Sequence, residues 1–136
     1  MKNIRMFLGS ISKAIPVLFF SMLFLFACEK YSYDPPKADP GKIYSFQTDI
    51  QSVFTAKCIG CHAAGRTQPN LEAGSAYNSL TSGGFISTDP VNSPETSRLY
   101  LIQTTQVANK PDHRSFLSDL QKISFLEWIR QGALNN

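Results

Sequence analysis

Apolar residues recur at helical spacing in the stretch that ends at residue 57. They follow one another every three or four positions, as on the buried face of an amphipathic helix, and are Phe46, Ile50, Val53 and Phe54. Within this stretch, residues 48–51 (Thr-Asp-Ile-Gln) have the form of a capping box. The pattern therefore predicts a short helix, capped by Thr48, that leads directly into residue 58.

A second helix is predicted close to the end of the chain. Residues 118–121 (Ser-Asp-Leu-Gln) form another capping box, and Gly132 is placed as a C-terminal stop. On a helical projection, the polar side chains between these signals occupy only a narrow stripe. We therefore expect this helix to be buried on most sides, with Trp128 packed in the core.

The middle of the chain, residues 63–117, has weak apolar periodicity. It is rich in Gly, Ser, Thr, Asn and Pro, and its apolar islands are short, at residues 76–80 and 97–102. This composition predicts one or two short helices and long loops. The expected fold class is thus mostly α and loop-rich, and a loop-rich domain of about 90 residues would be marginal on its own core.

The N-terminal segment has a different pattern. Residues 14–27 are uncharged and mostly apolar, follow three cationic residues, and end directly before Cys28. This run is shorter than the roughly 20 residues that span a bilayer but fits the apolar part of a signal peptide, which is about 7–15 residues long. Residues 25–28 (Leu-Phe-Ala-Cys) resemble a bacterial lipoprotein box, which predicts a signal peptide over 1–27 and a lipid on Cys28. An uncleaved membrane anchor or a plain secretory signal is the alternative.

The formal charge of +3 comes from this leader alone. Residues 28–136 contain ten Lys and Arg and ten Asp and Glu, so no basic surface for nucleic acid is expected. Residues 28–43 contain three prolines and a glycine without apolar periodicity, which indicates a flexible tether. The remaining residues, 44–136, form the predicted domain.

The run Cys58-Ile59-Gly60-Cys61-His62 is the most specific motif in the chain. CxxCH is the attachment signature of c-type haem, in which both thiols form thioethers with the porphyrin and the imidazole binds the iron. We therefore expect one haem c, held covalently by Cys58 and Cys61, with His62 as an axial ligand. With lipid on Cys28, no thiol is left over in an oxidising compartment.

Three other interpretations of these cysteines remain open. A redox dithiol would stand at the start of a helix in a βαβ unit, but no strand pattern flanks residues 58–61. A zinc site would require Cys58, Cys61 and both histidines together, which is an unusual spacing. The third alternative is a structural pair that occurs by chance.

Together these features resemble the class I c-type cytochrome domain, in particular the lipoprotein-anchored mono-haem cytochromes of bacterial envelopes. Besides CxxCH, the resemblance lies in residues 49–54, 68–71, 94–100 and 128–133. It implies a small helical fold around one haem and a hydrogen bond from His62 to the carbonyl of Pro69. It also implies single-electron transfer with redox proteins of the envelope. Arg66 and Arg114 are candidates to bind haem propionates, or are ordinary surface charges.

The second axial ligand departs from the pattern of this family. Most such domains use a methionine in the loop before the last helix, but all three methionines of this chain lie in the leader. His113 is in the corresponding loop and is the expected ligand. An open or water-bound position, or Lys110, is the alternative. Replacing a thioether by imidazole predicts a lower reduction potential.

These features lead to one main functional hypothesis and two alternatives. The first is a membrane-anchored electron carrier without catalytic residues, exposed to the periplasm or at the cell surface. A five-coordinate haem would instead indicate a small-ligand sensor or a peroxidase-like enzyme. The remaining alternative is a haem-bearing accessory lipoprotein of a larger envelope complex.

Overall fold

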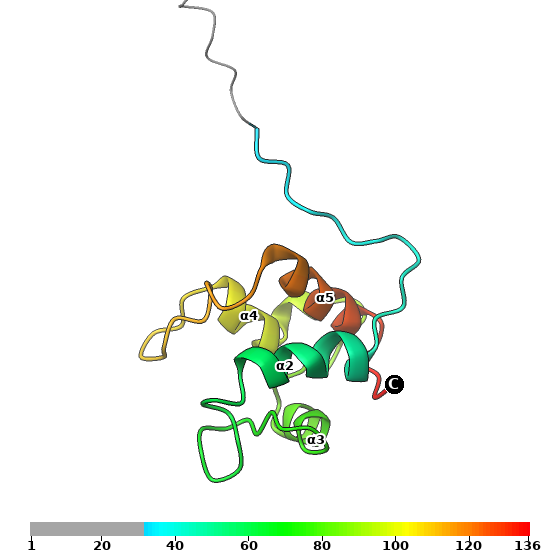
Figure 1. Ribbon diagram of the computed structural model, residues 1–136. Coiled ribbons are helices and arrows are strands. Elements are labelled where there is room, and N and C mark those ends of the chain that lie inside the picture. The colour runs from blue at the N-terminus through cyan, green and yellow to red at the C-terminus, as the bar shows by residue number, and fades with distance from the viewer. Residues whose placement is uncertain (1–31) are drawn as a thin grey trace, which may run out of the picture. The chain divides into compact units, whose positions relative to one another are not determined.

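The computed structural model describes residues 32–136 and confirms the mostly α fold class (Figure 1). Every element described below lies in one compact unit, Pro35–Asn136. It contains no strand, and its elements are the π-helical turn η2 (Phe46–Ile50), α2 (Gln51–Lys57), α3 (Ala76–Ser82), the 3₁₀ turn η3 (Pro94–Thr96), α4 (Arg98–Thr104) and α5 (Asp119–Arg130).

The predicted signal peptide and the lipid site at Cys28 lie outside the described residues. Among residues 32–136, no helix has the length and apolar character needed to cross a bilayer. The short apolar islands at residues 76–80 and 97–102 are the places where α3 and α4 form, which confirms the expected short helices in the middle of the chain.

The first helix begins earlier than the sequence predicts. Ser45 is its N-cap, because the Ser45 hydroxyl accepts a hydrogen bond from the backbone N–H of Thr48 at 3.4 Å. In return, a carboxylate oxygen of Asp49 accepts the backbone N–H of Ser45 at 2.8 Å. The predicted cap at Thr48 is therefore wrong, since Ser45 and Asp49 already satisfy the first turn. From there η2 continues into α2, which ends at Lys57.

At the other end of the domain, the predicted signals of α5 are confirmed. Ser118 and Gln121 form both hydrogen bonds of a capping box, and Gly132 follows the helix with φ +96°. Fewer sides of α5 are buried than expected, however. The helix packs against η2, η3 and α4, but Leu120 near its start is 60% exposed. The fully buried side chains are Phe125, Trp128 and Ile129.

An aromatic cluster forms the centre of the core. The ring of Phe46 lies 5.3 Å from the rings of both Trp128 and Tyr77, between ring centroids. Phe54 and Phe125 meet edge to face at 5.3 Å. Trp128 is fully buried and donates its indole N–H to the carbonyl of Leu134 at 2.9 Å. The expected packing role of Trp128 is therefore confirmed, and its contact is with the start of the first helix.

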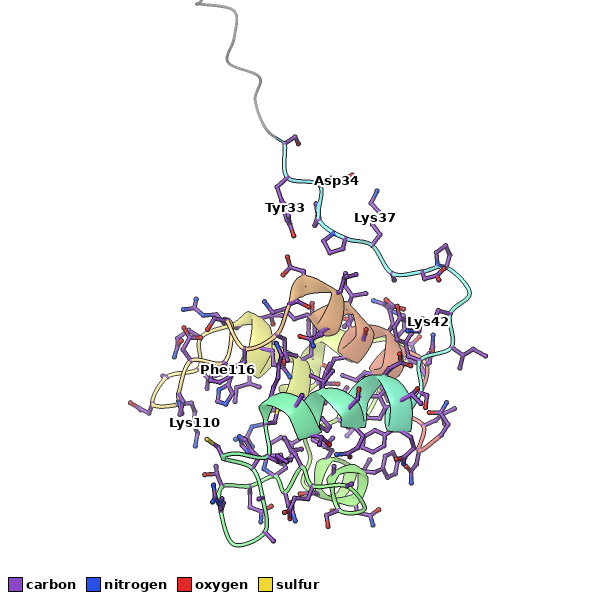
Figure 2. All side chains as sticks on the ribbon, in the orientation of Figure 1. Tyr33, Asp34, Lys37, Lys42, Lys110 and Phe116 are labelled. Atoms are coloured by element: carbon purple, nitrogen blue, oxygen red, sulfur yellow. The ribbon has the colours of Figure 1, made fainter. Side chains whose placement is uncertain are left out.

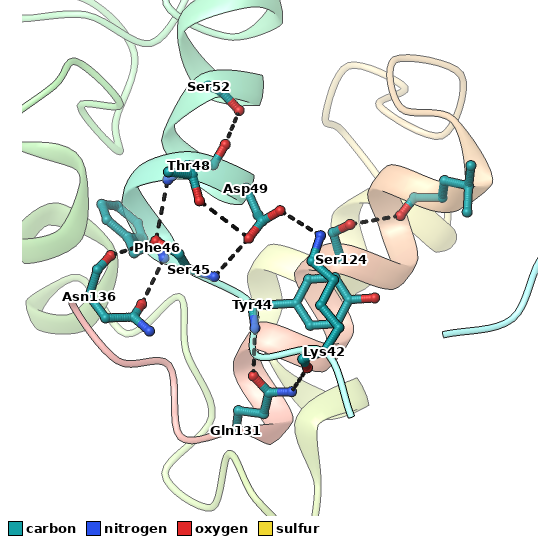
Figure 3. A network of polar contacts seen from close by, with 11 residues as sticks. Lys42, Tyr44, Ser45, Phe46, Thr48, Asp49, Ser52, Ser124, Gln131 and Asn136 are labelled. Atoms are coloured by element: carbon teal, nitrogen blue, oxygen red, sulfur yellow. Dashed lines mark hydrogen bonds and ion pairs between the residues drawn. The ribbon is translucent and has the colours of Figure 1, made fainter. Parts of the chain in front are cut away.

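Polar contacts hold the two ends of the domain together beside this cluster (Figure 3). The backbone N–H of Tyr44 donates to the side-chain oxygen of Gln131 at 2.9 Å, and the amide of Gln131 donates to the carbonyl of Lys42 at 2.9 Å. Asn136 accepts hydrogen bonds from the backbone of Phe46 at 2.9 Å and from the hydroxyl of Ser45 at 2.8 Å. These contacts keep the start of the first helix next to the end of α5.

Replacing Asp49 by Asn should lower the free energy of unfolding at pH 7 by about 1 kcal/mol, the usual cost of losing a helix cap. Partial burial raises the pKa of the Asp49 carboxyl, but hydrogen bonds from Lys42 and from the N–H of Ser45 outweigh it, so the net pKa is lowered. A lowered pKa stabilises the fold above the unfolded-state value, and this contribution is lost as the pH falls through the folded-state value.

The difference between wild type and Asp49→Asn should therefore narrow below about pH 4, when measured by urea unfolding across a pH series. Glu95→Gln is a matched control, because Glu95 is exposed on η3. A difference that stays constant down to pH 3 would contradict the assigned role of Asp49.

Candidate functional site

The CxxCH residues form a turn that directly continues α2. Cys58 is the C-cap of this helix, and its backbone N–H donates to the carbonyl of Phe54 at 2.8 Å. The carbonyl of Cys58 then accepts the N–H groups of Cys61 at 3.1 Å and of His62 at 2.9 Å. One helical turn thus brings both cysteines and His62 to the same end of α2.

The two thiols have different surroundings. Cys58 is half-buried and packs against the core, whereas Cys61 is exposed, and both are free. Burial raises the pKa of the Cys58 thiol; the cation of Lys57 lowers it and Cys61 raises it, with a net increase. Reactive dithiols have the opposite property, because a helix N-terminus or a cation lowers the pKa of their first cysteine. The position of Cys58 at the C-terminal end of α2 disfavours the redox-dithiol alternative.

The zinc alternative requires four ligands to converge. Within residues 32–136, which include Cys58, Cys61, His62 and His113, no group of three or more His, Cys, Asp or Glu side chains is arranged to hold a metal ion. The chain therefore does not present these four side chains as a tetrahedral zinc site does.

His62 is oriented by the carbonyl of Pro69. Its Nδ1 lies 3.2 Å from the carbonyl oxygen of this buried proline, which is the contact that the family resemblance implies. A carbonyl oxygen only accepts hydrogen bonds, so this contact assigns a proton to Nδ1 and leaves Nε2 as the ring nitrogen that can serve as a metal ligand. The carbonyl of His62 in turn accepts the N–H of Leu71 at 2.8 Å, which secures the loop that carries Pro69.

His113 has the same arrangement in a different loop. Its Nδ1 lies 2.8 Å from the carbonyl oxygen of Pro111, so by the same reasoning Nε2 is left as the free ligand atom. Sequence reasoning missed Pro111. The two prolines stand on opposite sides of their histidines and at different spacings, so no shared sequence pattern could have indicated the second contact.

The structure brings the two histidines together. His62 and His113 lie with ring centroids 6.1 Å apart and ring planes at 54°, and they are the only imidazoles of the chain. Bonds of about 2.0 Å from a metal to two imidazole nitrogens on opposite sides place the ring centroids roughly 6 Å apart. Rotation of either ring about that axis leaves the distances unchanged. The spacing of the pair therefore fits two axial ligands of one iron.

The arginines considered as propionate ligands already have partners. The guanidinium of Arg114 donates Nε and Nη2 to Asp112 at 3.0 and 2.9 Å, and these hydrogen bonds lower the pKa of the Asp112 carboxyl to about 2. Arg66 donates to the carbonyl of Gly60 within the turn that carries the cysteines. Arg114 thus makes its contacts within the loop that carries His113, and Arg66 makes its contact with the CxxCH turn.

Comparison with protein-family models, with curated proteins and with solved structures gave no match. The chemical interpretation of the site therefore depends on its own residues: the attachment motif, the tautomers of the two histidines and the distance between their rings.

The exposure of the thiols predicts their relative reactivity in protein expressed without the leader, to which no haem is attached. Cys61 should be alkylated by iodoacetamide faster than Cys58, because Cys58 is half-buried and its pKa is raised. Peptide mapping by mass spectrometry measures both rates, and unfolding in guanidinium should make them similar. Faster alkylation of Cys58 in the folded protein would contradict this geometry and favour an activated dithiol.

Proposed function

We propose that residues 44–136 form a class I c-type cytochrome domain with one covalent haem, which transfers single electrons in a bacterial cell envelope. The observation that carries the proposal is the pairing of His62 with His113, at a separation that suits one iron, directly beside a CxxCH turn. Cys58 and Cys61 are the proposed thioether residues.

The proposed axial ligands are prepared by their own loops. Because the carbonyls of Pro69 and Pro111 hold the Nδ1 protons, both histidines offer Nε2 without a change of tautomer. A bound haem would supply one-electron redox chemistry. His113 as a ligand in place of a methionine would favour a lower reduction potential.

The same pair favours an electron carrier over the sensor and peroxidase-like alternatives. Those activities need an open coordination position, whereas His113 is half-buried and its ring centroid lies 6.1 Å from that of His62. The exposure of Cys61 supports a haem edge that reaches the surface, where a redox partner protein can approach. Residues 28–136 have balanced charge, so the proposal includes no strong electrostatic steering of that partner.

The proposal predicts the visible spectrum of the full-length protein, expressed with haem-attachment machinery and purified in detergent. We expect haem that remains bound on a denaturing gel, low-spin spectra in both oxidation states and no rapid carbon monoxide binding. His113→Ala should convert the iron to a high-spin form that binds carbon monoxide readily, because it removes the sixth ligand.

Lys110→Leu is the matched comparison for the ligand assignment, because leucine removes the amine without adding a thioether that could bind iron. It should leave the spectrum unchanged if His113 is the ligand, and it would abolish the low-spin form if Lys110 were. A high-spin wild type would support the sensor or peroxidase-like alternative instead. The double variant Cys58→Ser, Cys61→Ser should lose its covalent haem. Covalent haem that remains in this variant would overturn the attachment assignment.

The membrane part of the proposal depends on Cys28. Because lipid on this residue is the proposed anchor, Cys28→Ser should move the haem protein from the membrane to the soluble fraction. Fractionation followed by haem staining measures the distribution. An unchanged distribution would favour a different anchor, including docking to a larger envelope complex, which is the accessory-lipoprotein alternative.

A further inference from the structure

The loop that carries His113 has few contacts with the rest of the domain. Residues 104–116 are exposed except for His113, which is half-buried, and Figure 1 shows this loop between α4 and α5 in yellow to orange. Its hydrogen bonds are largely internal, such as Lys110 to Val107 at 3.2 Å and the double contact of Arg114 with Asp112. Burial of apolar side chains therefore does little to hold the loop in place.

One side chain from outside the loop reaches it by a hydrogen bond. The ammonium of Lys57 donates to the carbonyl oxygen of Phe116 at 2.9 Å, across 59 positions of sequence. Figure 2 labels Phe116 on the loop that precedes α5. A hydrogen bond from a charged donor is stronger than one between neutral groups. Lys57 thus connects the loop to the helix that ends at the CxxCH turn.

Phe116 passes this connection on to His113. The backbone N–H of Phe116 donates to the carbonyl of His113 at 3.1 Å, and the two rings lie 5.5 Å apart at 35° between their planes. The side chain of Phe116 is itself 52% exposed, so its position is not fixed by burial. The burial of the next residue, Leu117, and the hydrogen bond from Lys57 both hold the backbone of Phe116, and the hydrogen bond from Lys57 joins it to α2.

We infer that Lys57 is a positioning residue for the second axial ligand, holding the loop so that His113 stays opposite His62. This inference rests on the proposed function and adds to it the element that keeps the sixth coordination position closed. Lys57 is the last residue of α2 and precedes Cys58. The same helix end therefore fixes the attachment turn and the loop across from it.

Lys110 and Lys122, two other lysines of the described residues, do not have this arrangement. Lys110 lies in the loop itself, and its side chain has no polar partner among residues 32–136. Lys122 lies on α5 and pairs with Asp119 at 3.7 Å. Lys110→Leu therefore removes the same charge as Lys57→Met without removing a contact between the loop and α2, and it adds no thioether to the loop of His113.

The test is the rate of carbon monoxide binding to the ferrous, full-length haem protein. Carbon monoxide binds when His113 leaves the iron, so the rate reports the fraction of open protein. Lys57 is exposed, so its hydrogen bond contributes only modestly to holding the loop. Lys57→Met should therefore raise the rate of carbon monoxide binding about three- to tenfold. Lys57→Arg keeps a cationic donor and should stay close to wild type, as should Lys110→Leu. Lys57 also lowers the pKa of the Cys58 thiol, which is a proposed site of haem attachment. Samples are therefore compared at equal haem content.

Equal rates for Lys57→Met and Lys110→Leu, with a low-spin wild type that resists carbon monoxide, would overturn this inference and leave the proposed function intact. A high-spin wild type that binds carbon monoxide rapidly would overturn both. If Lys57 acts only through general stability, Lys57→Met and Lys57→Arg should both have a lower thermal unfolding midpoint and faster carbon monoxide binding, which would overturn the inference. If carbon monoxide binding is fast in Lys57→Met and slow in Lys57→Arg, Lys57 is a positioning residue.

Discussion

The packing of Phe46 against Trp128 is the contact on which the rest of the domain depends. It joins the first helix to the last, and the hydrogen bonds of Gln131 and Asn136 close the same junction from outside. Because η2 runs into α2 without a break, this junction also sets the direction in which the chain leaves at Cys58. A hydrophobic contact at one end of the helix thus orients the chemistry at the other end.

The two histidines are positioned by different parts of the chain. His62 follows α2 immediately, and a carbonyl seven residues further along orients it. His113 comes from an exposed loop, and its nearest support is the adjacent carbonyl of Pro111. Both rings are therefore oriented before any group is bound, which reduces the reorganisation that ligation would require. In both cases a backbone carbonyl supplies the hydrogen-bond acceptor.

Features determined by neighbouring residues could be predicted from the sequence. The cap of α5 at Ser118 and the stop at Gly132 are of this kind, and so is the CxxCH turn. The start of the first helix could not be predicted, because Ser45 is selected over Thr48 by Asp49 together with the distant Asn136. The contact of Lys57 with Phe116 also escaped prediction, since nothing in either local sequence indicates a bond between them. The pairing of His62 with His113 was expected from family resemblance rather than from spacing, and the structure shows the proximity of their rings.

The two histidines lie on segments that differ in length and in the number of supporting contacts. The hydrogen bond between His62 and Pro69 closes a short segment, whereas the approach of His113 closes a long one at a greater entropic cost and with fewer supporting contacts. The loop of His113 is therefore expected to open before the core in local unfolding, whereas the buried Pro69 and Leu71 tie the segment after His62 to the core. The two imidazoles, although chemically alike, should consequently exchange with solvent on different timescales.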